Sequence, residues 1–113
     1  MSIITKICDA LHAADIPAYL PGKAEGVCKA AHAVVSDAGR QQQGRTTGRR
    51  IILVTVYVPA DRPLDLSGTL VKAEEALLTV REIRRTGEIS PEAIDDDKKA
   101  YCASIEFSAL CAI

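Results

Sequence analysis

Residues 101–113 read YCASIEFSALCAI, and their apolar side chains recur at every second position. Successive side chains of a β-strand point to opposite faces of the sheet, so this alternation predicts one long strand with a buried face. The face expected to be buried carries Tyr101, Ala103, Ile105, Phe107, Ala109, Cys111 and Ile113. The opposite face carries Cys102, Ser104, Glu106 and Ser108. Other apolar elements must therefore pack against one side of this strand.

Three further stretches predict strands. Residues 51–58, IILVTVYV, are rich in β-branched side chains and end at Pro59. Because both of their faces are largely apolar, they are expected to form a central strand. In residues 31–36, Ala31, Ala33 and Val35 alternate with His32, Val34 and Ser36, as in a short strand. In residues 80–89, Ile83 lies among charged neighbours, which is typical of a polar strand near a sheet edge.

Two amphipathic helices are expected, over residues 2–14 and 66–79. Their apolar stripes recur at helical spacing and consist of Ile4, Ile7, Leu11 and Ala14 in the first and of Leu66, Leu70, Ala73, Leu77 and Val80 in the second. The order α, β, β, α, β, β predicts an α+β fold: a mixed or antiparallel sheet of about four strands with two helices packed on one face. A chain of 113 residues, 48% hydrophobic, suits a single domain over residues 1–113.

Residues 37–50, DAGRQQQGRTTGRR, contain three glycines and four arginines, and Ala38 is their one apolar residue. This composition predicts a long exposed hairpin loop. Gly39 and Gly44 have the spacing of a phosphate-binding P-loop, with Arg45 where that motif requires Lys. The segment leads into a strand rather than a helix, which argues against phosphate binding of that kind.

Composition and targeting signals exclude several classes of protein. A net charge of −1 argues against a general nucleic-acid binder, and one Phe, three Tyr and no Trp leave few stacking platforms. The start of the chain lacks the pattern of a signal peptide, and the longest apolar run is far short of the roughly 20 residues that span a bilayer. The four cysteines show no close pair. We therefore expect a soluble chain made in a cytoplasm with reduced thiols.

Histidine and cysteine suggest two kinds of chemistry. Cys8 with His12 and Cys28 with His32 form two Cys-x-x-x-His pairs, which could supply four zinc ligands. Within a strand, however, Cys28 and His32 would lie about 13 Å apart, too far to hold one ion. An enzyme using Cys or Ser as nucleophile and a histidine as base has no local signature here. The sequence thus predicts no enzyme, no catalytic residue, no metal and no cofactor.

Charge is segregated along the chain. Four arginines make residues 37–50 basic: Arg40, Arg45, Arg49 and Arg50. Five carboxylates make a later segment acidic: Glu88, Glu92, Asp95, Asp96 and Asp97. Unlike patches can pair across a head-to-tail interface between subunits, and projecting arginines can also line a passage for DNA by binding phosphates. We take both segments as candidate interaction sites.

Two segments resemble a known family: LVKAEEALLTV (residues 70–80) and RRTGEISPEAIDDDKKAYCASIEF (residues 84–107). The acidic turn that runs into a Tyr-x-x-Ser-Ile-x-Phe strand is similar to the small tail-terminator and tail-completion proteins of long-tailed bacteriophages. The similarity is best over residues 65–113 and otherwise lies in element order and length. It includes no catalytic motif.

The resemblance implies a virion subunit, assembled in the bacterial host cytoplasm, that forms a ring, commonly of six copies. Such a ring stops growth of the tail tube and docks the head connector, while DNA passes through it. Its expected partners are other copies of itself, the tail tube protein, the head connector or head-completion protein and passing DNA, but no membrane. Related head-completion and minor capsid proteins have similar sizes.

Two alternatives from other classes remain open. One is a small oligomeric α+β regulatory domain that binds a metabolite, for which residues 21–23, Pro-Gly-Lys, offer a weak ligand loop. The other is an enzyme built on Cys8, His12 or His32. Substituting the histidines would abolish activity in the enzyme, whereas it would be nearly silent in a terminator subunit.

Overall fold

The structure is a computed structural model that describes residues 3–22, 28–42, 47–86, 90, 93–96 and 98–112. Within these residues it contains two helices and a six-stranded mixed sheet, which confirms the predicted α+β class. The elements in chain order are α1 (Ile3–Ala13), β1 (Ala18–Tyr19), β2 (His32–Gln42), β3 (Thr47–Pro59), α2 (Asp65–Leu77), β4 (Ile83–Arg85), β5 (Ala93–Asp95) and β6 (Ala100–Ala112). The sheet thus has more strands than the four or so expected.

The sheet is built around β3. The strand order is β1-β2-β3-β6-β4, and β5 also pairs with β6. β3 is antiparallel to both of its neighbours, with Val54 opposite Val35 on one side and Ile105 on the other. β1 and β2 are parallel, which makes the sheet mixed. The central position predicted for residues 51–58 is therefore confirmed.

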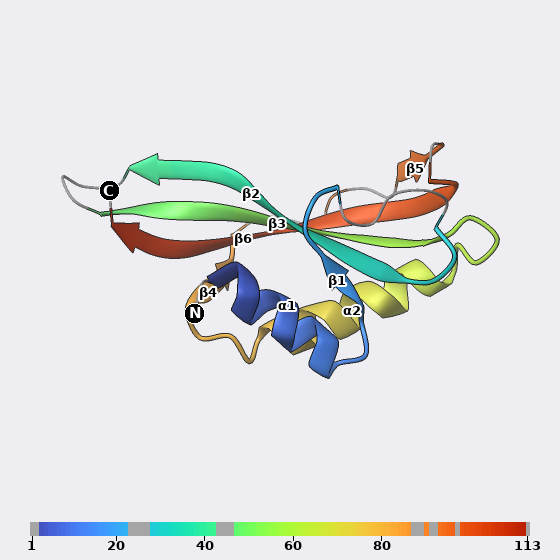
Figure 1. Cartoon of the computed structure of the whole chain (residues 1–113), viewed down its shortest axis with the longest axis horizontal. Helices are drawn as coiled ribbons and strands as arrows, with labels where there is room; N and C mark the ends of the chain where they lie inside the picture. The colour runs from blue at the N-terminus through green and yellow to red at the C-terminus, as the bar shows by residue number, and fades with distance from the viewer. Residues whose placement is uncertain are drawn as a thin grey trace.

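Both helices lie on one face of the sheet, as predicted (Figure 1). Their inward residues are spaced three or four apart, so each helix presents a continuous apolar stripe to the strands. The buried helical residues are Ile7 and Leu11 of α1 and Leu66, Leu70, Ala73 and Leu77 of α2. Alternate strand residues complete the core: Ala33, Val35, Ile52, Val54, Val56, Val58, Ala103, Ile105, Phe107 and Ala109. The opposite face of the sheet, here called the open face, carries side chains that are mostly half-buried.

The prediction of a long loop over residues 37–50 is wrong. β2 continues to Gln42 and β3 begins at Thr47, so most of these residues belong to a paired hairpin. The ladder uses backbone groups, which pair whatever the polarity of the side chains, and this stretch is polar because it extends beyond the core. A β-bulge interrupts the pairing between Asp37 and Gly39, where Gly39 adopts a φ of 111° that glycine tolerates.

The edge strands differ from the sequence prediction in length. Of the strand expected over residues 80–89, residues 83–85 form β4, and residues 87–89 are outside the described residues. Val80 is instead a buried residue of the turn that precedes β4. β1 and β5, of two and three residues, were not predicted, because an alternating pattern cannot be recognised over so short a length. The helix expected over residues 66–79 ends at Leu77, and the Thr79 hydroxyl donates to the Ala76 carbonyl at 2.7 Å in the turn that follows.

Replacing Ile105 by Ala should lower the free energy of unfolding by about 2–5 kcal/mol, because the side chain is fully buried and its loss leaves a cavity. Urea denaturation measures this change. Leu64→Ala is the matched control, since Leu64 is 92% exposed and its truncation should change stability by about 0.5 kcal/mol or less. Equal effects of the two substitutions would contradict the core described above.

Candidate functional site

Three strands extend past both helices and past β4 (Figure 1). We call the end of the sheet that includes this extension the β-arm; it comprises residues 37–42 of β2, 47–51 of β3 and 108–112 of β6. Ser108 and Ala109, at its base, still pair with β4. The β-arm accounts for the elongated shape of the molecule, which measures 48 × 26 × 24 Å. Beyond Ala109, which still belongs to the core, the β-arm is held together by strand pairing, so it is a candidate surface for interaction.

The arginines predicted as one basic loop lie on two faces of the β-arm. Arg49 is on the open face and its Nη1 donates to the Ser108 hydroxyl at 3.1 Å. Arg50 is two residues before the buried Ile52 in the same strand, so its side chain lies on the face of the sheet that the helices cover. Arg40 is opposite Arg50 in the register and lies on the same face. Arg45 is outside the described residues. The basic charge is therefore divided between the two faces.

Asp37 sits at the bulge and is held by two donors. Its Oδ1 accepts a hydrogen bond from the Gly39 backbone N–H at 3.0 Å, and its Oδ2 pairs with Arg50 Nε at 2.8 Å. The Gly39 N–H, aided by the guanidinium of Arg50, keeps the pKa of Asp37 below its ordinary value. The carboxylate thus ties the bulge of β2 to the neighbouring strand.

The described acidic residues, Asp95 and Asp96, lie at the other end of β6 from the β-arm. β5 pairs with the start of β6, Asp95 opposite Ala100, whereas the β-arm contains the end of that strand (Figure 1). Asp95 Oδ1 accepts from the Lys98 backbone N–H at 3.1 Å, and Asp96 is exposed. Glu88, Glu92 and Asp97 are outside the described residues. At about 3.3 Å per residue, the two charged regions are separated by roughly 30 Å.

The sheet has an open edge on each side of the β-arm. β1 covers the outer edge of β2 at Ala33 and Val34, and no described strand pairs with that edge beyond this point. β4 covers the outer edge of β6 as far as Ala109, and none of the described strands pairs with that edge beyond it. Leu110, 71% exposed, lies on this second open edge. Sequence reasoning missed both edges, because they depend on where β1 and β4 end.

Cys28 and His32 are adjacent, which corrects the distance expected from the sequence. Cys28 precedes β2 rather than lying in it, and the chain bends at Ala30. As a result, Cys28 Sγ is 3.8 Å from His32 Nδ1, and both side chains reach the Ala30 carbonyl, at 3.3 and 3.0 Å. Among the described residues no group of three or more potential metal ligands comes together.

The three thiols that the structure describes, those of Cys8, Cys28 and Cys102, are not activated. Burial raises the pKa of Cys8, Cys28 and Cys102 above the ordinary value, with Asp9 adding to the effect at Cys8 and Asp95 at Cys102. A raised pKa keeps a thiol protonated at neutral pH, and the protonated form is a poor nucleophile. His12, the other histidine considered for catalysis, places Nε2 3.2 Å from the Ala18 carbonyl.

An aromatic stack packs around His32 on the open face. The ring of Tyr57 stacks on the imidazole with centroids 5.2 Å apart, and Tyr19 meets it edge-on at 5.7 Å. Lys98 Nζ lies 5.0 Å from the centre of the Tyr57 ring, a cation–π distance. This stack ties β1, β2 and β3 to the turn before β6, which is a structural role.

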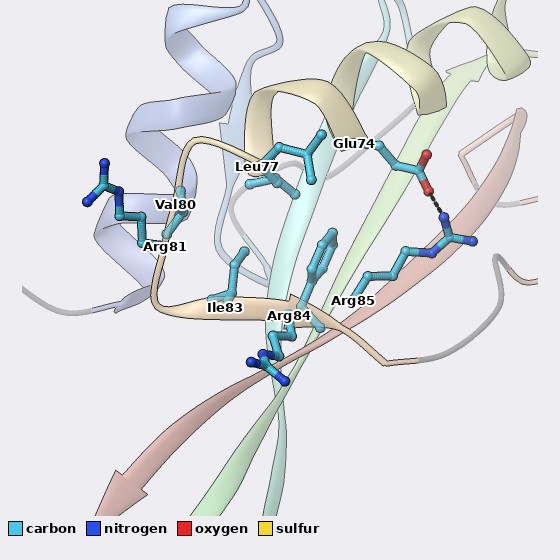
Figure 2. Close-up of a pocket in the computed structure, with 9 residues that line it drawn as sticks. Glu74, Leu77, Val80, Arg81, Ile83, Arg84 and Arg85 are labelled. Atoms are coloured by element: carbon cyan, nitrogen blue, oxygen red, sulfur yellow. Dashed lines mark ion pairs between the residues drawn. The ribbon is translucent and has the colours of Figure 1, made fainter.

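A cavity of about 700 Å³ lies between the end of α2 and the β4 edge. Its buried floor consists of Leu77, Val80, Ile83 and Phe107. Figure 2 shows Arg85 paired with Glu74 across one side, the Arg85 Nη1 to Glu74 Oε1 distance being 2.5 Å, while Arg81 and Arg84 point outward. The cavity therefore combines an apolar floor with a basic rim.

Comparison with known proteins assigns no family: no family model matches the chain, and no curated protein matches it. In the part of the chain that the structure describes, neither helix is long and apolar enough to cross a membrane.

Replacing Asp37 by Asn should lower stability at neutral pH, because the amide keeps an acceptor for Gly39 but loses the charge that attracts Arg50. Because the pKa of Asp37 is lowered in the folded state, its charge stabilises the fold at pH values above the ordinary aspartate pKa. This stabilisation is lost as the pH falls through the folded-state pKa. Urea midpoints of the two proteins should thus differ at pH 7 and converge at about pH 2.

Asp61→Asn is the control, because Asp61 is an exposed carboxylate in the turn before α2. If the Asp37→Asn variant and the wild-type protein differed equally at both pH values, the ionised pair with Arg50 would not be the source of the difference.

Proposed function

We propose that this chain is a structural subunit that assembles head to tail into a ring, in the manner of a bacteriophage tail terminator. The observation that carries the proposal is the β-arm with its two open edges. These edges belong to different strands, β2 and β6, on opposite sides of the central β3. Two different surfaces that meet on successive copies form a heterologous interface, and such interfaces close into rings when the rotation allows.

The charge distribution supports the same arrangement. The β-arm carries Arg40, Arg49 and Arg50, whereas Asp95 and Asp96 lie near the opposite end of β6. Separated charges of opposite sign favour an oriented encounter between copies over a random one. Arg49, on the open face, is also placed to meet the phosphates of DNA if that face lines the passage.

In this proposal the ring ends a tail tube and joins it to the head connector, with DNA passing through. A head-completion or minor capsid protein, located at the head of the virion, would use the same ring architecture. In either role the chain is part of the virion and binds first to other copies of itself.

Negative-stain imaging and native mass spectrometry of concentrated protein test the proposal. We expect closed rings with a central hole wide enough for duplex DNA, and a larger assembled fraction at low than at physiological salt, because exposed charges are screened by salt. Arg49→Glu should reduce the assembled fraction, whereas Arg62→Glu, an exposed arginine in the turn before α2, should leave it unchanged. A chain that stays monomeric under all of these conditions would contradict the proposal.

The cavity beside α2 favours a second candidate, a ligand-binding domain. Its volume and apolar floor are typical of small-molecule sites, and its arginines suit an anion with an aliphatic tail. If this candidate holds, dodecanoate should raise the melting temperature of the wild-type protein and not of an Arg84→Glu variant. Dodecyltrimethylammonium, which has the same tail and the opposite charge, is the matched ligand control; an equal effect of both would exclude a specific anion site.

A further inference from the structure

We infer that two copies of this chain associate through α2, with the two helices packed antiparallel about a two-fold axis at Val71. The contact is made by a row of exposed residues on the side of α2 that faces away from the sheet. We call this row the outer stripe; it consists of Leu64, Gly68, Val71, Glu75 and Leu78. The outer stripe includes no residue of the β-arm, so this contact goes beyond the proposed ring and does not depend on it.

The apolar side chains of the outer stripe are exposed. Leu64 is 92%, Val71 53% and Leu78 82% exposed, and these are three of the seven large apolar side chains that are exposed among the described residues. Single exposed aliphatic side chains are common on protein surfaces, but several on one side of one helix mark an interaction surface. The outer stripe therefore calls for a partner outside the described part of the chain.

The helix is long enough to align these side chains. The residues that flank α2, Leu64 and Leu78, also have helical backbone angles, with φ/ψ of −71°/−16° and −62°/−19°. Leu64, Val71 and Leu78 are seven residues apart, which is close to two helical turns, so they share one side of the helix with a drift of about 20° per seven residues. The buried residues of α2 occupy the opposite side, against the sheet.

Gly68 is a second and independent sign of a partner. Glycine weakens the interior of a helix relative to alanine, and its usual justification is the close approach of a neighbour. A Cβ added to Gly68 would meet no described atom within 4 Å, so packing inside the described structure does not require the absent side chain. The bare backbone at Gly68 instead allows a helix of another molecule to approach closely.

The outer stripe is complementary to itself in the antiparallel direction. Val71 is midway between Leu64 and Leu78, so a two-fold axis at Val71 places each leucine against the other leucine of the second copy. The same axis places Glu75 beside the partner's Gly68, where the missing side chain leaves room for the longer one. A parallel pair in register would instead bring the two Glu75 carboxylates together, and like charges repel each other.

The size of the contact predicts weak association. The thirteen residues of α2 with one flanking residue at each end span about 22 Å, so each copy buries on the order of 300 Å². Stable interfaces bury about 1,200 Å² or more in total. We therefore expect a dissociation constant in the upper micromolar range. At the low micromolar concentrations of urea denaturation the chain is then a monomer, and Leu64 stays exposed.

A disulfide test addresses the two-fold axis directly. Val71→Cys is introduced into a chain whose four native cysteines are replaced by Ala, and the concentrated protein is oxidised. We expect covalent dimers on non-reducing gels, because the two cysteines meet at the axis. Leu64→Cys is the matched control. Leu64 is more exposed than Val71, but the two copies of residue 64 lie about 21 Å apart in an antiparallel pair, so this variant should give no dimer.

A charge at the axis tests the contact in the wild-type background. We expect Val71→Glu to weaken self-association at least tenfold in sedimentation velocity, because it brings two carboxylates together at the axis. Lys72→Glu is the matched control, since Lys72 is exposed but points about 100° away from Val71 around the helix; it should change association by about twofold or less. The runs are made at physiological salt, which screens contacts between exposed charges but not an apolar contact. Circular dichroism confirms that both variants fold.

Gly68→Gln separates the stability of the helix from the contact. Glutamine favours a helix more than glycine does and meets no described neighbour at this position, so the urea midpoint of the variant should rise. Its side chain occupies the space that the second helix needs, so self-association should fall at least tenfold. An unchanged or stronger association of Gly68→Gln would contradict the close approach at this glycine.

The possible results distinguish this contact from the proposed ring. Equal disulfide formation by Leu64→Cys and Val71→Cys, or unchanged association of Val71→Glu, would overturn the antiparallel contact and leave the ring intact. Dimers joined through Val71→Cys in a chain that forms no rings would support the contact and contradict the ring. A wild-type chain that remains monomeric at millimolar concentration would overturn both.

Discussion

The fold depends on the pairing of β3 with β6. Thirteen register pairs join the two strands, from Thr47 opposite Ala112 to Pro59 opposite Ala100. β4 and β5 both pair with β6, so they would lose their partner without it. The core depends on the same pairing, since Ile52, Val54 and Ile105 present their side chains to the helices from these two strands. A net contribution of about 1 kcal/mol per hydrogen bond is modest, but burying alternate apolar side chains along the same ladder makes this pairing the strongest element of the molecule.

Much of this architecture could be predicted from residue patterns. Alternation predicted β6 because every second side chain enters the core, and a stretch apolar on both faces predicted that β3 is central. Helical spacing predicted both helices to within about two residues. The segment around Gly39 was misjudged because its polar composition resembles a loop, while its backbone pairs with β3. These residues are polar because they lie far from the core, although their backbone is regular strand.

The candidate interaction surface was harder to predict, for a physical reason. Charge segregation can be seen in the sequence, but the assignment of Arg49 and Arg50 to opposite faces depends on strand parity within a ladder that composition does not indicate. The open edges depend on where two very short strands end. The contact between Cys28 and His32 depends on a bend at Ala30, which changed an expected separation of about 13 Å into direct contact. In each case the decisive information is which residues lie beside one another across the sheet.

The distance in sequence between β3 and β6 has a consequence for how the protein reaches its native state. The hairpin of β2 and β3 is local and can form early, but β6 begins about 40 residues after β3 ends, and closing so long a loop slows folding. Until β6 docks, the most apolar strand of the chain, residues 51–58, has one side unpaired and is a template for aggregation. Yield in a heterologous host should therefore depend on the time spent in this intermediate, and slow synthesis at low temperature is the condition that favours recovery of folded chains.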